Sequence, residues 1–122
     1  IFLPAISVGL LSAAVLNLNN LRDREEDKKN NKNTLVVKLG INKAKKYHYF
    51  LVLFALISGL IYTFLDFRTV YQLIFLVAFI PLIKNLITVS KNTIPAELDG
   101  ELKKVALSTF LFAVLFSIGQ IF

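Results

Sequence analysis

Two carboxylates one helical turn apart, at the end of an apolar segment, are the residues of this sequence best suited to chemistry. Asp23 and Asp27 are four positions apart, so on a helix they project from one face, about 40° apart around the axis. Asn19 and Asn20 lie near that face one turn earlier. Such a group suits Mg²⁺, which takes one or two carboxylates and completes its shell with water and phosphate oxygens. The spacing alone is equally compatible with a solvated helix face.

Basic residues surround the acidic pair, and their types suit a phosphate ligand. Arg22 directly precedes the first acid, and Lys32 follows the second by five positions. Arginine offers bidentate hydrogen bonds and lysine a point charge, so both suit a diphosphate that one metal ion does not neutralise. Further basic residues lie in the same stretch, namely Arg24, Lys28 and Lys29. A diphosphate bound through metal would be a good leaving group.

Four apolar segments must position this cluster: residues 1–16, 49–65, 70–89 and 105–122. With 56% hydrophobic residues and a mean hydropathy of +0.65, the chain carries more apolar surface than a soluble domain of 122 residues can bury. Each segment approaches the roughly 20 residues that a helix needs to cross hydrocarbon, and none alternates as a barrel strand does. A soluble bundle would need polar helix faces, which are missing. The sequence predicts an all-α, multi-pass transmembrane helical bundle with four helices in the lipid bilayer.

The distribution of charge predicts an orientation in the membrane. Residues 22–46 contain nine Lys or Arg and four Asp or Glu. Short basic loops stay in the cytoplasm, so we expect the loop 17–46, and with it 91–104, to be cytoplasmic at the inner (plasma) membrane. The turn around Asp66 and Arg68 should then face outward. The basic residues form no stripe with interleaved aromatic residues, which argues against nucleic acid as a partner.

Local signals divide the loop into helices. Residues 17–29 can continue the first membrane helix, and the Asn-Asn pair at 30–31 should end it, because asparagine tolerates the left-handed conformation. A short helix is expected from about Thr34 to Gly40, where a C-terminal glycine is favoured. Asn42 is expected to cap the next membrane helix.

The longer string around the acids resembles the second acidic motif and trailing segment of the UbiA superfamily of intramembrane prenyltransferases. The resemblance covers essentially the whole chain, and the matching residues read Asn19-Asn20-Leu-Arg22-Asp23-x-x-x-Asp27 followed by Lys32-x-Thr34-Leu-Val-Val-Lys38-Leu-Gly40. The Asn-Asn pair stands where the 4-hydroxybenzoate branch more usually has Tyr-Ala. The motif is therefore most similar to the branch that prenylates 1,4-dihydroxy-2-naphthoate in menaquinone biosynthesis.

The resemblance implies an Mg²⁺-dependent transfer of a polyprenyl group from prenyl diphosphate to an aromatic acid acceptor, with loss of carboxylate from the naphthoate. It implies one membrane domain of nine helices, of which residues 1–122 would be the C-terminal part with the last four. Without the first acidic motif, which would lie upstream, this fragment alone is expected to be inactive. Matched by position, the metal ligands and catalytic acids are Asp23 and Asp27, and the substrate-binding residues are Arg22, Lys32, Asn20 and Asn19.

Two other functions stay open. The acceptor could be another aromatic compound such as 4-hydroxybenzoate, or the chain could be a non-catalytic transporter module whose acids bind a coupling cation.

Lys84 either lines a cavity or extends to the membrane interface. His48, between Tyr47 and Tyr49, is interpreted as part of an interfacial aromatic belt rather than as a catalytic residue. The absence of cysteine excludes disulfides and thiolate metal sites.

Overall fold

The computed structural model describes residues 2–93 and 95–121, which form helices joined by short turns. No strand occurs in these ranges. The first half contains α1 (Phe2–Arg22), α2 (Arg24–Lys29), α3 (Leu35–Leu39) and α4 (Ile41–Leu65). The second half contains the 3₁₀ helix η1 (Val70–Ala78), α5 (Phe79–Lys91), the 3₁₀ turn η2 (Pro95–Leu98) and α6 (Asp99–Ile121).

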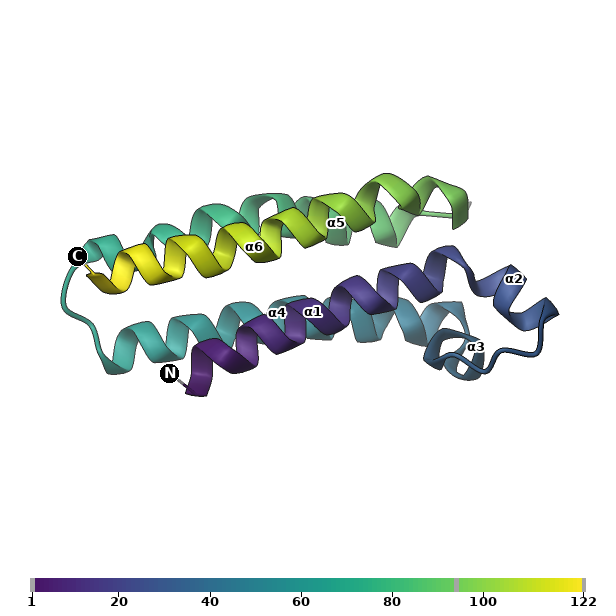
Figure 1. Ribbon diagram of the computed structural model, residues 1–122, viewed down its shortest axis with the longest axis horizontal. Helices are drawn as coiled ribbons and strands as arrows, with labels where there is room; N and C mark the ends of the chain where they lie inside the picture. Colours follow the sequence, from purple (N-terminus) through teal and green to yellow (C-terminus); the bar gives the residue numbers. More distant parts are fainter. Residues whose placement is uncertain (1, 94, 122) are drawn as a thin grey trace.

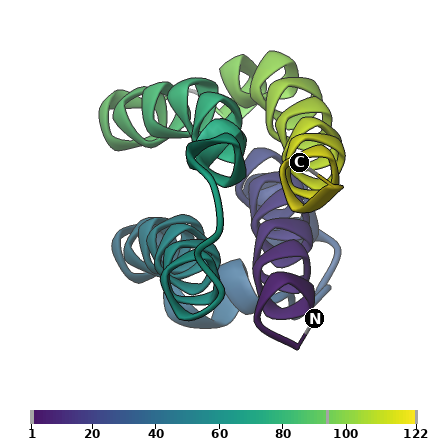
Figure 2. The ribbon, with the colours of Figure 1, turned by 90° about the vertical axis from the view of Figure 1, so that its left-hand side faces the viewer.

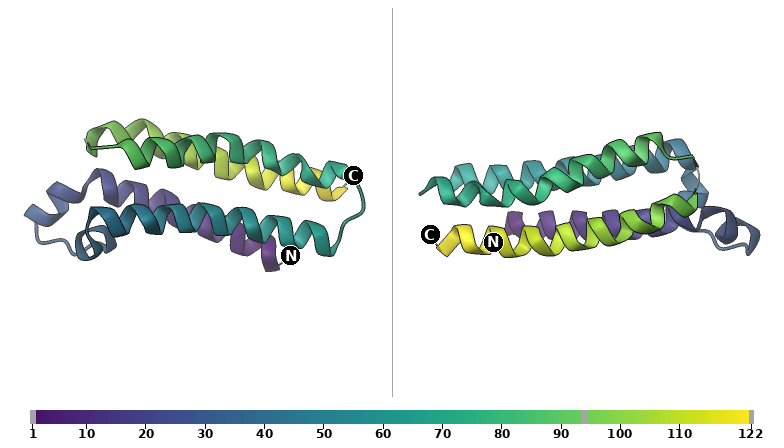
Figure 3. Two further views of the ribbon diagram at one scale, coloured as in Figure 1. Left: turned by 180° about the vertical axis from the view of Figure 1, so that it is seen from behind. Right: turned by 90° about the horizontal axis from the view of Figure 1, so that it is seen from above.

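The long helices form an antiparallel bundle. Figure 1 shows that the chain reverses direction at each connection, so that both labelled termini lie at one end and α2 and α3 at the other. Seen end-on in Figure 2, the helices occupy the corners of a square in the order α1, α4, η1 with α5, and α6, and helices at adjacent corners are in contact. In Figure 3, α1 and α4 form one layer and α5 and α6 the other. The loop with the acidic pair and the α5–α6 connection therefore share one end.

Three helical segments are long and apolar enough to cross a membrane: Ile41–Leu65, Val70–Lys91 and Asp99–Ile121. The second consists of η1 and α5 in series, as the apolar segment 70–89 predicts. The prediction of four spans is not met in full, because α1 is not among the candidates in the searched part of the chain. The last two turns of α1 carry Asn17, Asn19, Asn20 and Arg22.

The loop follows the predicted pattern with two corrections. The expected continuous helix over 17–29 is interrupted at Asp23, a turn residue between α1 and α2. Asn31 ends this region in the left-handed conformation (φ 57°), and the Thr34 hydroxyl caps α3 by accepting from Val37 N, both as predicted. Asn42 does not cap α4. The chain turns at Gly40 (φ 85°), and α4 begins at the next residue, Ile41. Glycine adopts this φ without the steric cost of a Cβ, so α3 and α4 can follow each other without a linker.

Aromatic residues from η1, α5 and α6 pack in the centre of the second layer. The Phe75 ring lies 5.6 Å from Phe112 and 5.3 Å from Phe116, and Phe79 lies 5.5 Å from Phe112. Gly119 lets α6 approach η1, because a Cβ there would lie 2.9 Å from the carbonyl oxygen of Tyr71. This packing joins η1 and the first turn of α5 to the C-terminal half of α6, while contacts of α1 with α6 and with η2 place the start of α6 beside the end of α1.

Candidate functional site

Arg22 is the centre of the polar cluster at the end of α1. Its Nε lies 2.9 Å and its Nη2 3.3 Å from the two carboxylate oxygens of Asp23. Nη2 also donates to the side-chain oxygen of Asn19, at 2.7 Å. On the other edge of the guanidinium, Nη1 lies 2.8 Å from a carboxylate oxygen of Asp99, the first residue of α6. Arg22 therefore connects the acidic motif to a helix that begins 77 positions later in the chain.

The two acids of the motif keep helical spacing although a turn separates α1 from α2. The backbone N–H of Asp27 donates to the carbonyl oxygen of Asp23 at 2.8 Å, which is the hydrogen bond of an α-helical turn. The hydrogen bonds and charge of Arg22 hold the pKa of Asp23 below its usual range, with a smaller contribution from the charge of Lys32. Asp23 is consequently a carboxylate at neutral pH, which is the form that binds metal.

The carboxylate of Asp27 is half-buried and makes no hydrogen bond or ion pair with any described residue. Among the described residues, no three or more His, Cys, Asp or Glu side chains gather closely enough to hold a metal ion by themselves. Two carboxylates suffice only for a cation that takes its other ligands from water or substrate, as Mg²⁺ does. The donor set at Asp23 and Asp27 fits that ion in number and type.

The remaining predicted residues lie around this pair. Lys32 is exposed, and its backbone N–H donates to the carbonyl oxygen of Asp27 at 2.7 Å, which folds the turn after α2 back toward the acids. Asn20 is half-buried beside Asn19 on the last turn of α1. The predicted residues thus lie together at the end of the bundle that α2 and α3 occupy.

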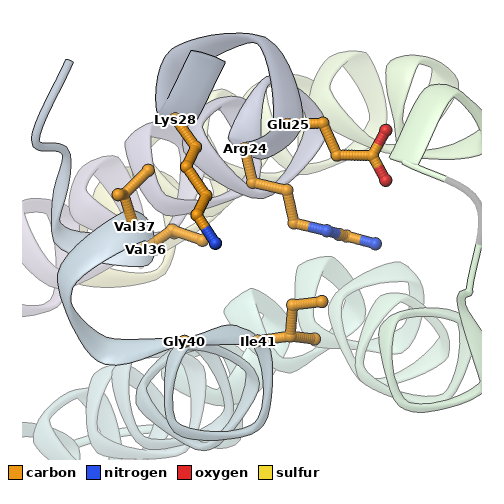
Figure 4. A pocket seen from close by; sticks show the side chains of 7 residues that line it. All are labelled: Arg24, Glu25, Lys28, Val36, Val37, Gly40 and Ile41. Atoms are coloured by element: carbon orange, nitrogen blue, oxygen red, sulfur yellow. The ribbon is translucent and has the colours of Figure 1, made fainter. Parts of the chain in front are cut away.

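Arg24 differs from its predicted role as a phosphate-binding cation. The side chain is only 8% exposed and donates to the carbonyl oxygens of Leu21 at 3.1 Å and Thr93 at 3.4 Å. A cavity of about 320 Å³ opens beside it between α2, α3 and the start of α4. Figure 4 shows Arg24 and Lys28 extending from α2 into this space. The lining residues are Arg24, Glu25, Lys28, Val36, Val37, Gly40 and Ile41.

The interpretation of His48 as an interfacial aromatic residue is wrong. Its side chain is fully buried, and Nε2 lies 2.7 Å from the Oδ1 atom of Asn85 on α5. Asn85 in turn donates from Nδ2 to a carboxylate oxygen of Glu101 on α6 at 3.0 Å, and Glu101 pairs with Lys104 at 3.1 Å. Because the Nδ2 atom of Asn85 donates to Glu101, the atom that faces His48 is the amide oxygen. An amide oxygen can only accept a hydrogen bond, so the histidine proton lies on Nε2. A buried polar network thus joins α4, α5 and α6.

Sequence reasoning missed Asp99 and this network for the same reason. Asp99 and Glu101 lie in a short charged segment that reads as an ordinary loop, and Asn85 lies in an apolar segment with no local partner. Asp99 pairs with a residue 77 positions away, Glu101 with one 16 positions away, and Asn85 also with one 37 positions away. Lys84, the charged residue of that segment, is exposed, and it also lines an open apolar hollow of about 430 Å³ between α4, η1 and α5, so both roles considered for it stay open.

Comparison with known proteins assigns the chain to a family. The chain is 40% identical over 119 residues to a 1,4-dihydroxy-2-naphthoate octaprenyltransferase of Haemophilus influenzae and 35% identical to the enzyme of the same name from Escherichia coli. Each alignment covers 98% of this chain but only 39% of the relative's length. No solved structure matches the chain significantly. Residues 1–98, including the entire acidic motif, match the profile of the UbiA prenyltransferase family. The chain therefore belongs to the UbiA prenyltransferase family.

Proposed function

We propose that the protein containing this chain transfers a polyprenyl group from a prenyl diphosphate to 1,4-dihydroxy-2-naphthoate, within the membrane and with Mg²⁺. The observation that carries the proposal is the paired geometry of Arg22, Asp23 and Asp27 at a helix end, in a chain similar over 98% of its length to naphthoate octaprenyltransferases. Menaquinone synthesis would be the pathway, with the loop 17–46 on the cytoplasmic side of the inner membrane.

The chemistry asks three things of the protein. The allylic C–O bond must break with its electron pair leaving on the diphosphate, a ring carbon of the acceptor must attack the resulting prenyl cation, and the ring must lose its carboxylate as CO₂. Mg²⁺, when bound, would neutralise part of the charge on the leaving diphosphate. Asp23 and Asp27 would hold that ion, and Arg22 and Lys32 would contact the diphosphate oxygens.

The described residues support each of these roles physically. Arg22 keeps the carboxyl of Asp23 ionised, and the carboxyl of Asp27 has no competing partner among the described residues. Lys32 is exposed and close enough to Asp23 to lower the pKa of its carboxyl, so its ammonium group lies within reach of a ligand bound there. A coupling-cation site in a transporter would have no use for these positive charges beside its acids.

The decisive experiment measures product formation by the natural protein in detergent with Mg²⁺, a prenyl diphosphate and either 1,4-dihydroxy-2-naphthoate or 4-hydroxybenzoate. We expect prenylated naphthoate, and turnover lowered by orders of magnitude in Asp23→Asn and in Asp27→Asn, because each removes a ligand that stabilises the leaving group. Asp66→Asn serves as the matched control, because Asp66 is an exposed acid that directly follows α4, at the end of that helix away from α3. Product only from 4-hydroxybenzoate would change the acceptor, and full activity of both variants would remove the metal assignment.

A binding experiment separates the enzyme from a transporter module. Arg22→Gln and Lys32→Gln should each weaken prenyl diphosphate binding by about tenfold or more, since a hydrogen bond to a charged group contributes about 1.5 to 3 kcal/mol. Acceptor affinity should stay the same in both variants. If wild-type protein binds Mg²⁺ but no prenyl diphosphate, the transporter alternative gains and the enzymatic proposal falls.

A further inference from the structure

Asp99 occupies the edge of Arg22 that an incoming anion would use. The guanidinium has five N–H donors. Asp23 takes Nε–H and one Nη2–H, and Asn19 takes the other Nη2–H. Only the Nη1 edge remains for a ligand, and there the Asp99 carboxylate already accepts a hydrogen bond at 2.8 Å. One of the two Nη1–H donors is left over, so a diphosphate that is to bind both of them without breaking the pairing of Arg22 to Asp23 must displace Asp99.

The position of Asp99 is fixed by buried neighbours on both sides. Leu98, which precedes it, is fully buried, and η2 packs against α1. Glu101, two residues later, is 6% exposed and accepts the hydrogen bond from Asn85 on α5. The first turn of α6 is thus held in place by packing and by the polar network. Asp99 is presented to Arg22 from a rigid helix start and not from a free loop.

The ion pair itself is accessible to solvent. The side chain of Asp99 is 74% exposed and that of Arg22 is 30% exposed. Exposed ion pairs contribute little to stability because water and salt screen them. A ligand with several negative charges can therefore replace the Asp99 carboxylate at Nη1 at small cost, whereas the two-point contact with Asp23 on the other edge stays in place.

We propose that Asp99 is a further residue of the diphosphate site, an inference that rests on the proposed function. Its carboxylate holds the Nη1 edge of Arg22 while no diphosphate is bound, which keeps the guanidinium oriented, and the diphosphate displaces it on binding. Asp99 is a positioning residue in this scheme, since it contacts Arg22 and not the reacting atoms. Its removal should make diphosphate binding tighter, which is the opposite of what loss of a metal or phosphate ligand would do.

The test measures binding of inorganic diphosphate, with excess Mg²⁺, to the natural protein in detergent by titration calorimetry. Asp99→Asn keeps the shape of the side chain and removes its charge. We expect binding about two- to fivefold tighter than in wild type, in line with the small contribution of exposed ion pairs. The gain in affinity should disappear when the same substitution is made in an Arg22→Gln background, because Asp99 and the diphosphate then no longer compete for a guanidinium. Asp66→Asn, whose carboxylate pairs with Arg68 at 3.8 Å, should change nothing.

The outcomes separate this inference from the function on which it rests. Equal or weaker binding by Asp99→Asn, with normal binding by wild type, overturns the role of Asp99 and leaves the proposed function standing. A gain that persists in the Arg22→Gln background also overturns it, because the effect is then a general loss of negative charge. If wild type and all variants fail to bind diphosphate and prenyl diphosphate, both proposals fall.

Discussion

Replacing Asn85 by leucine should destabilise the bundle more than any exposed substitution, because Asn85 links two other buried polar residues. Its oxygen accepts from His48 at 2.7 Å, and its amide nitrogen donates to Glu101 at 3.0 Å. The exposed fractions of His48, Asn85 and Glu101 are 0%, 1% and 6%. Leucine has a similar branched shape but offers neither group, so Asn85→Leu leaves a buried N–H and one oxygen of a buried carboxylate without their partner.

The magnitude follows from what is left unpaired. Hydrogen bonds between membrane helices contribute on average about 0.6 kcal/mol each, so the loss of two bonds sets a lower limit of about 1.2 kcal/mol. A buried donor or acceptor that stays in place without a partner costs about 1 to 3 kcal/mol, and a charged one more. The added apolar surface of leucine returns about 1 kcal/mol or less. We therefore expect Asn85→Leu to lower the free energy of unfolding by about 2 to 4 kcal/mol.

The assay is reversible unfolding of the natural protein in mixed micelles by titration with sodium dodecyl sulfate. Asn42→Leu is the matched control, because Asn42 is exposed in the first turn of α4 and makes no side-chain hydrogen bond with a described residue. Adding Glu101→Gln to Asn85→Leu should recover part of the loss, because no buried charge is then short of a partner. If Asn85→Leu is as stable as the Asn42→Leu control, the network contributes nothing and the reasoning is wrong.

Three further predictions test the site, the packing and the topology. Because Arg22 lowers the pKa of Asp23 in the folded protein, the stabilisation from this pair is present above the pKa of the carboxyl in the unfolded chain and is lost as the pH falls through its pKa in the folded protein. Arg22→Gln should raise the pKa of Asp23 in the folded protein and therefore move the acid limb of Mg²⁺-dependent diphosphate binding to higher pH. Gly119→Ala should lower thermal stability in detergent, since its Cβ would meet rigid backbone at 2.9 Å, whereas Gly9→Ala, with no neighbour within 4 Å, should not. The chain has no cysteine, so a single cysteine placed at Lys29 should react with an impermeant thiol reagent only in opened cells, and one in the turn after α4 should react in intact cells.

Local sequence signals predicted most of the elements because their causes are local. The apolar segments predicted the long helices, and the signals at Asn31, Thr34 and Gly40 predicted how the loop between the first two of them is divided. The exceptions concern competition between neighbours. Gly40 was expected only to end α3 and Asn42 to cap α4, but the backbone freedom of Gly40 lets α4 begin directly after it. The break at Asp23 was not predicted, because no helix-breaking residue occurs there.

The same distinction holds for the candidate site: residues that are close in sequence were predicted, and residues that tertiary packing brings there were not. Asp23, Asp27 and their neighbours are close in sequence, so helical spacing alone was enough to place them together. Asp99 and Glu101 reach the site or its support only because α6 packs between α5 and α1, which is a property of the tertiary fold. The buried position of His48 likewise depends on where α4 faces α5. A single polar residue in an apolar segment says that a partner is needed, but it does not say which one.

The structure also changes what the basic composition of the loop means for ligand binding. Counting charges suggests five cations around the acidic pair, but Arg22 is paired on both edges and Arg24 is buried against carbonyl oxygens. Lys28, Lys29 and Lys32 are exposed and make no ion pair with a described residue, so they can bind an anion without releasing a protein partner. Arg22 has one N–H left for a ligand and must give up Asp99 to offer a second. Substitution of a lysine should therefore remove one attraction, whereas substitution of Arg22 removes both an attraction and the group that keeps Asp23 ionised.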